Sequence, residues 1–337
     1  MLKNKVMFFN AQEVVETKIG YKIYRFDRET LSHINSNENG SGNWIGRYSC
    51  GTEIRFYSDS NIVTVTLLPE ISDGNLCVYL GNYFVGRYEL KAGEYKTLFL
   101  KRPEMFDNIN ADFFDGNTFD NHVWRLCPHN CLITLCDIDN TTGVIRPPKK
   151  SEMPSKTMLA YGSSITHGSG ALSNPYCYIE NVGRLLGLNI LNKGMGGSCF
   201  CEKEVVDMLL KNDFDYAYLE CGVNMYMRVE PEEFRKRFTY LVAEISKKTV
   251  PVFITTAYRF STYYFNDENK LNRINEYNQI IREVFDKYKK DNWKLLDGMK
   301  ILNDTTYLTV DGIHPSTEGH FQMAYNIVRE IKDIINK

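Results

Sequence analysis

The sequence predicts an α/β protein with two parts: a β-sandwich or jelly-roll domain over residues 1–148, followed by a parallel-sheet domain over residues 149–337. Three observations predict this arrangement. The first part consists of short alternating runs separated by turn residues, and a proline-rich segment follows it. In the second part, apolar runs alternate with amphipathic segments of helix length.

Short strands are expected throughout the first part. Turn residues such as Asp59-Ser-Asn61 and Ser72-Asp-Gly-Asn75 separate the alternating runs, and no convincing helical pattern lies among them. Leu80-Gly-Asn-Tyr83 is typical of a two-residue hairpin. Strands at this spacing favour a sandwich or jelly roll. The clearest expected strands are 53–57, 62–67, 76–80, 83–87 and 96–100.

Residues 146–154 are expected to form a stiff, exposed connector, because they contain two adjacent prolines, charged residues and a third proline. Beyond this connector, strand and helix patterns alternate, which indicates a parallel sheet with helices on both faces. Ligands of such sheets bind at the carboxyl ends of the strands. The expected strands are 157–161, 188–191, 216–220, 250–256 and 294–296, and the clearest helices begin after Pro231, near Leu271 and at Thr317.

Composition and charge argue against several classes of partner. The 337 residues are 43% hydrophobic and 24% charged, as in ordinary globular proteins. A formal net charge of -2 gives no electrostatic basis for binding nucleic acid or an anionic membrane surface. The apolar run from Val6 to Phe9 is too short for a signal peptide, and no run reaches the roughly 18 residues of a membrane span. We therefore expect a cytoplasmic protein.

The nine cysteines are expected to be reduced thiols. Cys127-Pro-His-Asn-Cys131 could suggest a metal site, but its flanks predict two strands around a Pro-His-Asn turn. Cys199-Phe-Cys201 lacks the two-residue gap of a redox or zinc pair. The sequence thus predicts neither a metal nor an organic cofactor.

Two segments contain the three groups that make a serine hydroxyl a nucleophile. Ser164 follows a predicted strand on a glycine turn, near backbone N–H groups able to stabilise an oxyanion. Asp311-Gly-Ile-His314 places a carboxylate three residues before an imidazole that could act as the base. Taken singly, a turn serine and a structural histidine are the more common explanations of these two segments. His167 is a competing base, but its place just past the turn favours a substrate-lining role.

Two further segments lie after the intervening strands. The glycines of Asn192-Lys-Gly-Met-Gly-Gly197 permit close backbone approach, although a plain tight turn would use them too. Asn224 could donate its amide to the same oxyanion, although asparagine is common in turns.

In this order, the four segments resemble the SGNH (GDSL-like) hydrolase superfamily over roughly residues 155–335. The resemblance implies a three-layer α/β/α, flavodoxin-like domain and a carboxylic ester hydrolase that needs no cofactor. It implies that Ser164 is the nucleophile, His314 the base and Asp311 its orienter. It also implies an oxyanion hole formed by Ser164, Gly197 and Asn224. Gly196 or Gly194 remains possible in place of Gly197.

The chain departs from the superfamily pattern at two positions. The usual Gly-Asp-Ser is Gly162-Ser-Ser164, and Met225 replaces an aspartate that often follows the asparagine. The first departure suggests a branch in which a hydroxyl makes the local turn contacts. Gly-Ser-Ser-Ile-Thr is a variant associated with esterases that carry an N-terminal β-sandwich, and the layout resembles that of carbohydrate esterase family 2.

The resemblance favours an O-deacetylase of sugars that acts on a small-molecule or oligosaccharide ester. Another acyl esterase, thioesterase or lipase-like enzyme is the alternative, and an inactive carbohydrate-binding protein is a third. Trp44, in a turn-rich segment, is the tryptophan expected to be exposed. It could stack on a sugar ring, and simple packing is the alternative role. The expected substrate-lining residues are His167, Tyr176, Phe200, Met225 and Tyr226.

Overall fold

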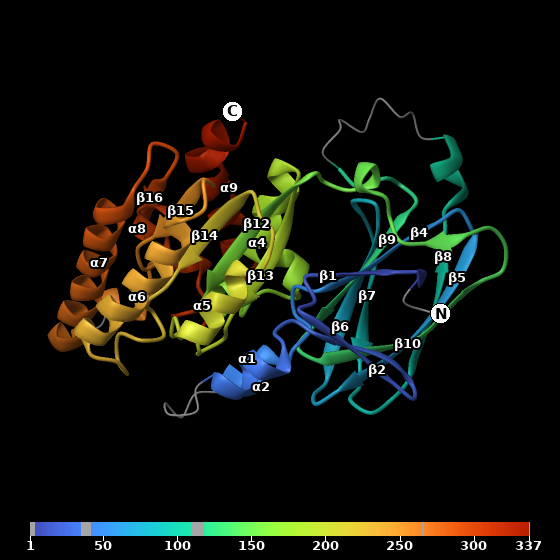
Figure 1. Ribbon diagram of the computed structural model, residues 1–337, viewed down its shortest axis with the longest axis horizontal. Helices are drawn as coiled ribbons and strands as arrows, with labels where there is room; N and C mark the ends of the chain where they lie inside the picture. The colour runs from blue at the N-terminus through green and yellow to red at the C-terminus, as the bar shows by residue number, and fades with distance from the viewer. Residues whose placement is uncertain (1–3, 35–41, 109–117, 265, 337) are drawn as a thin grey trace.

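The computed structural model describes residues 4–34, 42–108, 118–264 and 266–336, and it contains both predicted architectures (Figure 1). The first half of the chain forms a β-sandwich, and the second half forms a parallel sheet with helices on both faces. The predicted fold class is therefore confirmed. The jelly-roll connectivity and the boundary between residues 148 and 149 stay predictions.

The β-sandwich consists of two antiparallel sheets whose inward side chains form one core. Alternate residues of each strand point inward, as Val63, Val65 and Leu67 do in β5. The first sheet has the order β1 (Met7–Phe9), β4 (Glu53–Ser58), β9 (Val123–His129), β6 (Gly74–Leu80), β7 (Tyr83–Leu90), and β11 (Ile145–Arg146) pairs with β4. The second has the order β2 (Glu13–Thr17), β3 (Gly20–Tyr24), β10 (Leu132–Asn140), β5 (Ile62–Glu70), β8 (Lys96–Lys101).

The five clearest expected strands of this half are present, as are the two expected on either side of residues 127–131, and Leu80 pairs with Tyr83 across the predicted hairpin. The elements before residue 50 were not predicted. Besides β1 to β3 they include two short helices, α1 (Arg28–His33) and α2 (Gly42–Gly46). Asp27 caps α1, and Leu31 packs into the core of the parallel-sheet half. Packing against a distant part of the chain stabilises this short helix, and a local pattern does not report such packing.

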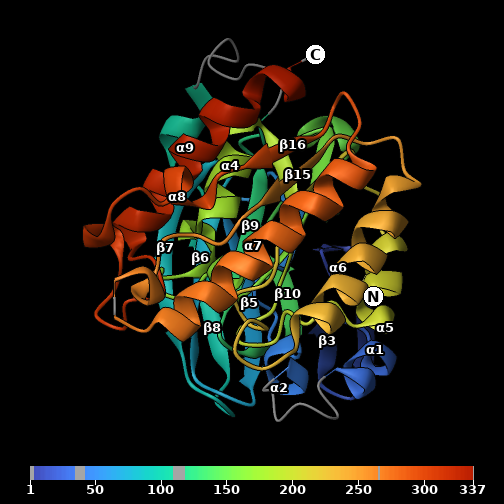
Figure 2. The same cartoon turned by 90° about the vertical axis from the view of Figure 1, so that its left-hand side faces the viewer.

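The parallel sheet has the order β13 (Leu188–Gly194), β12 (Lys156–Gly162), β14 (Tyr216–Glu220), β15 (Val252–Thr255), β16 (Lys294–Leu296). Successive side chains of β12 enter different cores, which makes the domain three-layered. Leu159 and Tyr161 pack with α5 (Lys203–Leu210), α6 (Pro231–Ser246) and α7 (Glu268–Tyr288). Met158 and Ala160 pack with α4 (Tyr178–Leu186), α8 (Gly298–Ile301) and α9 (Thr317–Ile335). Figure 2 looks onto the side covered by α6 and α7.

The segment between the two halves differs from the expected exposed connector. Pro148 and Pro154 are buried, and Arg146 forms an ion pair with Glu152 at 2.6 Å. The segment therefore packs against the folded parts that it joins.

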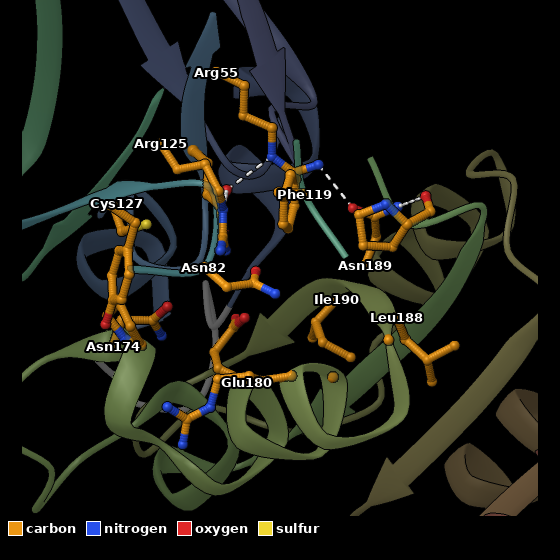
Figure 3. A pocket seen from close by; sticks show the side chains of 17 residues that line it. Arg55, Asn82, Phe119, Arg125, Cys127, Asn174, Glu180, Leu188, Asn189 and Ile190 are labelled. Atoms are coloured by element: carbon orange, nitrogen blue, oxygen red, sulfur yellow. Dashed lines mark hydrogen bonds and ion pairs between the residues drawn. The ribbon is translucent and has the colours of Figure 1, made fainter. Parts of the chain in front are cut away.

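Charged side chains form part of the buried interface between the halves (Figure 3). Glu53 accepts hydrogen bonds from Arg55 Nε and Arg125 Nε, each at 2.8 Å. Arg55 Nη1 donates across the interface to Asn189 Oδ1 at 2.8 Å. These residues and Glu180 line a cavity of about 50 Å³. Burial would raise the pKa of Glu53, but the two guanidinium groups hold it well below its usual range.

Within the described ranges, no helix has the length and apolar character required to cross a bilayer. The cytoplasmic location stays a prediction from the sequence.

Replacement of Glu53 by glutamine should destabilise the fold by about 3–5 kcal/mol, because the buried Arg55 and the partly buried Arg125 would lose their counter-charge. Urea denaturation of the wild-type protein and the variant measures this loss. Glu16→Gln, at an exposed position of β2, is the matched control and should change the free energy of unfolding by less than about 0.5 kcal/mol. Equal, small effects of both changes would contradict the importance of the buried pair.

Candidate active site

A pocket of about 490 Å³ opens at the carboxyl edge of the parallel sheet. The strands end level there, because Gly162 pairs with Gly194 of β13 on one side and with Glu220 of β14 on the other. The loops that follow the three strands therefore meet at one edge, as expected for this kind of sheet. The lining residues come from both halves of the chain: Ile45, Tyr48, Asn130, Ser164, His167, Ser169, Gly196, Gly197, Val223, Asn224, Tyr226, Met227, Arg228, Phe260, Ile313 and His314.

Ser164, His314 and Asp311 lie in a continuous hydrogen-bonded line at this pocket. His314 Nε2 is 2.8 Å from Ser164 Oγ, and His314 Nδ1 is 2.7 Å from Asp311 Oδ2. Ser164 is the first residue of α3 (Ser164–His167), which Ser163 caps. An imidazole held in this way can take a proton from the hydroxyl while the carboxylate keeps its ring oriented.

The Asp311 carboxylate is held by its own turn. Oδ1 accepts hydrogen bonds from Thr309 Oγ1 at 2.8 Å, the Ile313 N–H at 2.8 Å and the His314 N–H at 3.0 Å. Partial desolvation would raise the pKa of Asp311, but the His314 ring and these donors hold it well below its usual range. Gly312 has a φ of 68°, a conformation that favours glycine in this turn. The carboxylate is thus ionised and immobilised beside the imidazole.

Asn224 is oriented by the loop that follows β13. Its Oδ1 accepts a hydrogen bond from the Cys199 N–H at 3.1 Å. The Nδ2 hydrogens are then the donors that the side chain can offer to a molecule in the pocket. This orientation fits the predicted contribution of Asn224 to an oxyanion hole.

Among the glycines of this loop, Gly196 and Gly197 line the pocket and Gly194 does not. The Gly194 N–H donates to Asn192 Oδ1 at 2.9 Å, and a Cβ at this position would collide with the backbone of His167. Close packing explains the glycine at 194. Gly197 has a φ of 69°, so the turn itself favours glycine there. The glycine whose backbone N–H is predicted to contribute to the oxyanion hole is therefore Gly196 or Gly197.

Glu220, the last residue of β14, contacts the turn that carries Ser164 and was missed by the sequence analysis. Its Oε2 accepts hydrogen bonds from the Ser163 N–H and Oγ, both at 2.7 Å, and from Thr166 Oγ1 at 3.0 Å. Burial, with a smaller contribution from the Cys199 thiol, raises the pKa of Glu220 to about 8. A buried carboxyl group with a raised pKa thus ties this turn to the neighbouring strand.

These contacts explain the departure from Gly-Asp-Ser. The Ser163 hydroxyl accepts a hydrogen bond from the Ile165 N–H at 3.1 Å, so a hydroxyl makes the local turn contact as expected. The carboxyl group comes from β14 instead. One sequence feature could have pointed to Glu220: it is an acidic residue at the end of a strand that is otherwise uncharged and proves to be fully buried.

Two of the five expected substrate-lining residues line the pocket, namely His167 and Tyr226. The expectation is wrong for Phe200 and Met225, because both side chains are fully buried in the core on the α5, α6 and α7 side. Tyr176 does not line this pocket either; it is half-buried and packs against β6 and β9 of the sandwich, so its substrate-lining role stays a prediction. Apolar side chains that follow a strand turn into the core as readily as into a cleft, and the sequence does not separate the two cases.

The N-terminal half supplies one wall of the pocket through Ile45, Tyr48 and Asn130. The Tyr48 ring stacks on the His167 ring with centroids 6.4 Å apart. Trp44 is exposed as predicted, and its Nε1 donates to Tyr48 Oη at 2.8 Å. An aromatic surface therefore extends from the pocket onto the N-terminal half.

Two buried basic side chains attach the same half to the glycine loop. Arg25 Nη1 donates to the Gly194 carbonyl oxygen at 2.6 Å, and Lys193 Nζ donates to the Arg25 carbonyl oxygen at 2.7 Å. Burial lowers the pKa of Arg25 to about 10 and lowers that of Lys193 as well. Residues near the start of the chain thus hold the segment that leads to Gly196 and Gly197.

This fold and the hydrogen-bonded line at its carboxyl edge define an acyl ester hydrolase of the SGNH type. The profile of the GDSL-like Lipase/Acylhydrolase family matches residues 155–332. The chain belongs to this family, which confirms the resemblance seen in the sequence, and it is a carboxylic ester hydrolase. Among curated proteins, no sequence matches it.

Solved structures share the whole two-part architecture at low sequence identity. A salicylyl-acyltransferase from a tetracycline biosynthetic pathway superposes with a TM-score of 0.80 at 15% identity, covering 98% of this chain and 95% of that one. A family two carbohydrate esterase from Cellvibrio japonicus gives 0.66 at 11% identity, covering 99% and 96%. One from Clostridium thermocellum in complex with cellohexaose gives 0.64 at 12%, covering 98% and 99%.

Glu220→Gln should reduce the pH dependence of stability. The native state keeps the Glu220 proton between the usual pKa of 4.5 and about 8, whereas the unfolded state releases it. The Glu220 contribution to the free energy of unfolding therefore falls as pH rises through this window, by up to about 1.4 kcal/mol per pH unit. Urea denaturation at several pH values should show a shallower decline in the variant.

Glu204→Gln, at an exposed position of α5, is the control and should leave the slope unchanged. The glutamine oxygen can still accept from Ser163 and Thr166, so Glu220→Gln should remain folded. A slope equal to that of the wild-type protein would show that Glu220 is already ionised at neutral pH.

Proposed function

We propose that this protein is a serine esterase that removes O-acetyl groups from carbohydrates. In this proposal Ser164 is the nucleophile, His314 the base and Asp311 its orienter. The observation that carries it is the pair of contacts made by His314, 2.8 Å to the Ser164 hydroxyl and 2.7 Å to the Asp311 carboxylate. Residues 150 positions apart in the chain meet in this way beside an open pocket.

The chemistry would proceed in two steps through an acyl-enzyme. The Ser164 oxygen attacks the ester carbonyl carbon while His314 takes its proton, and His314 then gives this proton to the departing alcohol. Water, deprotonated by the same imidazole, attacks the acyl carbonyl carbon, and the imidazole then returns this proton to the Ser164 oxygen as the acid is released. The negative charge on the carbonyl oxygen would be held by the Ser164 N–H, the N–H of Gly197 or Gly196 and Asn224 Nδ2.

The proposed carbohydrate substrate rests on the pocket's surroundings. Trp44 and Tyr48 provide an aromatic surface beside the pocket, where a sugar ring could stack. The architecture is shared with family two carbohydrate esterases, one of them solved with cellohexaose. In a cytoplasmic enzyme the substrates would be imported oligosaccharides.

Another acyl esterase, thioesterase or lipase-like enzyme is the competing function. Val223, Met227, Phe260 and Ile313 give the pocket an apolar part that could hold a longer acyl chain.

Loss of the nucleophile or the base should abolish ester cleavage. Ser164→Ala and His314→Ala should each lower kcat for p-nitrophenyl acetate by about 10⁴–10⁶, as in other serine hydrolases. Asn224→Ala should lower it by about 10²–10³, because one oxyanion donor is lost. Ser246→Ala and His33→Ala, both outside the lining of the pocket, should leave kcat unchanged. Full activity of Ser164→Ala would overturn the proposed mechanism.

A substrate series separates the proposed function from its alternative. Acetylated oligosaccharides should be deacetylated with a higher kcat/KM than p-nitrophenyl acetate, and kcat/KM should fall along the acetate, butyrate and octanoate esters. Trp44→Ala should raise KM for the oligosaccharide about 10-fold or more without changing KM for p-nitrophenyl acetate. A preference for octanoate, with no sugar deacetylation, would favour the lipase-like alternative.

A further inference from the structure

Three cysteines from two different segments meet behind the pocket. Cys199 and Cys201 belong to the loop after β13, and Cys221 directly follows β14. Their sulfur atoms all lie within 4.8 Å of one another, and Cys199 Sγ is 3.8 Å from Cys221 Sγ. We call these three residues the thiol cluster. Phe200, between the first two, is also buried.

The thiol cluster is closed to solvent. Its three residues are 0%, 1% and 3% exposed, in chain order, and they belong to the core shared with α5, α6 and α7. In the described part of the chain, no histidine or carboxylate side chain joins the three sulfurs as a fourth ligand. The cluster therefore offers three soft ligands of one kind in a space without bulk water.

The backbone at the thiol cluster is held in a costly conformation. Cys201 has a φ of 51°, in the left-handed region that residues with a Cβ avoid. Its N–H donates to Tyr161 Oη at 3.2 Å, which supports this turn from the neighbouring strand. Such strain persists where the surrounding structure demands it, and it is commonly found at functional sites. Here the strained residue contributes one of the three sulfurs.

The spacing of the sulfurs matches a three-coordinate metal ion. Three thiolates at about 2.3 Å from one ion lie about 4 Å from each other. Thiolates select soft ions, chiefly copper(I) and zinc, and zinc prefers a fourth ligand in tetrahedral geometry. We propose that the thiol cluster is a binding site for copper(I), coordinated by Cys199, Cys201 and Cys221.

Binding would exchange protons for the metal without a redox step. Copper enters as copper(I), each cysteine that coordinates it loses its thiol proton, and up to three protons leave. The bound site carries excess negative charge, which is costly in a core. Arg237 lies next to this segment, because its Nη1 donates to the Phe200 carbonyl oxygen at 3.4 Å, and its Nε also pairs with Glu233 Oε1 at 2.8 Å.

The thiol cluster is coupled to the pocket through Asn224. The Cys199 N–H holds the Asn224 amide oxygen, and Cys221 lies three residues before Asn224 in the same loop. A metal that draws the two cysteines together would shift this amide. The resulting change in kcat rests on the proposed role of Asn224, whereas copper binding itself does not.

Titration of the reduced protein with copper(I), without oxygen and in competition with a chromophoric copper(I) chelator, tests the site. One equivalent should bind, and X-ray absorption should show three sulfur atoms at about 2.3 Å. Cys201→Ser and Cys221→Ser should each weaken copper(I) binding by at least about 100-fold. Loss of a residue that only hydrogen-bonds to a metal ligand already weakens metal binding about 10- to 100-fold, and these variants lose a ligand itself. Zinc(II), titrated in parallel, should bind more weakly, because the thiol cluster does not provide the fourth ligand that zinc prefers.

Cys136→Ser is the matched control, because this partly exposed thiol on β10 lies outside the cluster and should not affect the titration. Circular dichroism checks that each variant folds. If a variant does not fold, the number of sulfur ligands seen by X-ray absorption in the wild-type protein still tests the proposed site. Unchanged binding in folded Cys201→Ser and Cys221→Ser, two-sulfur coordination, or no uptake would overturn the proposal. The esterase assay is separate, so failure of either proposal is recognised independently.

Discussion

The level ends of three parallel strands are the constraint on which the site depends. Gly162 is paired on one side with Gly194 and on the other with Glu220, so the loops after β12, β13 and β14 begin at the same height. A parallel sheet brings these loops together although long stretches of chain separate them. His314 then reaches Ser164 from a fourth loop. A shift of one residue in either pairing would separate the groups.

A buried carboxyl group secures the most important of these loops. Glu220 contacts Ser163 and Thr166, on both sides of Ser164. Its raised pKa shows that burial outweighs the hydrogen bonds that would favour the ionised form.

The N-terminal half is part of the site's construction. Arg25 holds the carbonyl oxygen of Gly194, and Tyr48 stacks on His167 at the pocket wall. The buried ion pairs of Glu53 lie in the same interface between the halves. Ester cleavage by the parallel-sheet half alone would therefore take place in a pocket without one wall and with a less restrained glycine loop.

The sequence by itself determined the two fold types and the order of the four motif segments. Strand periodicity, helix periodicity and turn residues are local properties, so β14 and β16 could be placed to the residue. Tertiary structure alone decided that Tyr226 faces the pocket while Phe200 and Met225 enter the core. It also decided the partner of Ser163, the wall from the N-terminal half and the meeting of three cysteines. The physical reason is that these features depend on distances between segments far apart in the chain, which no local pattern records.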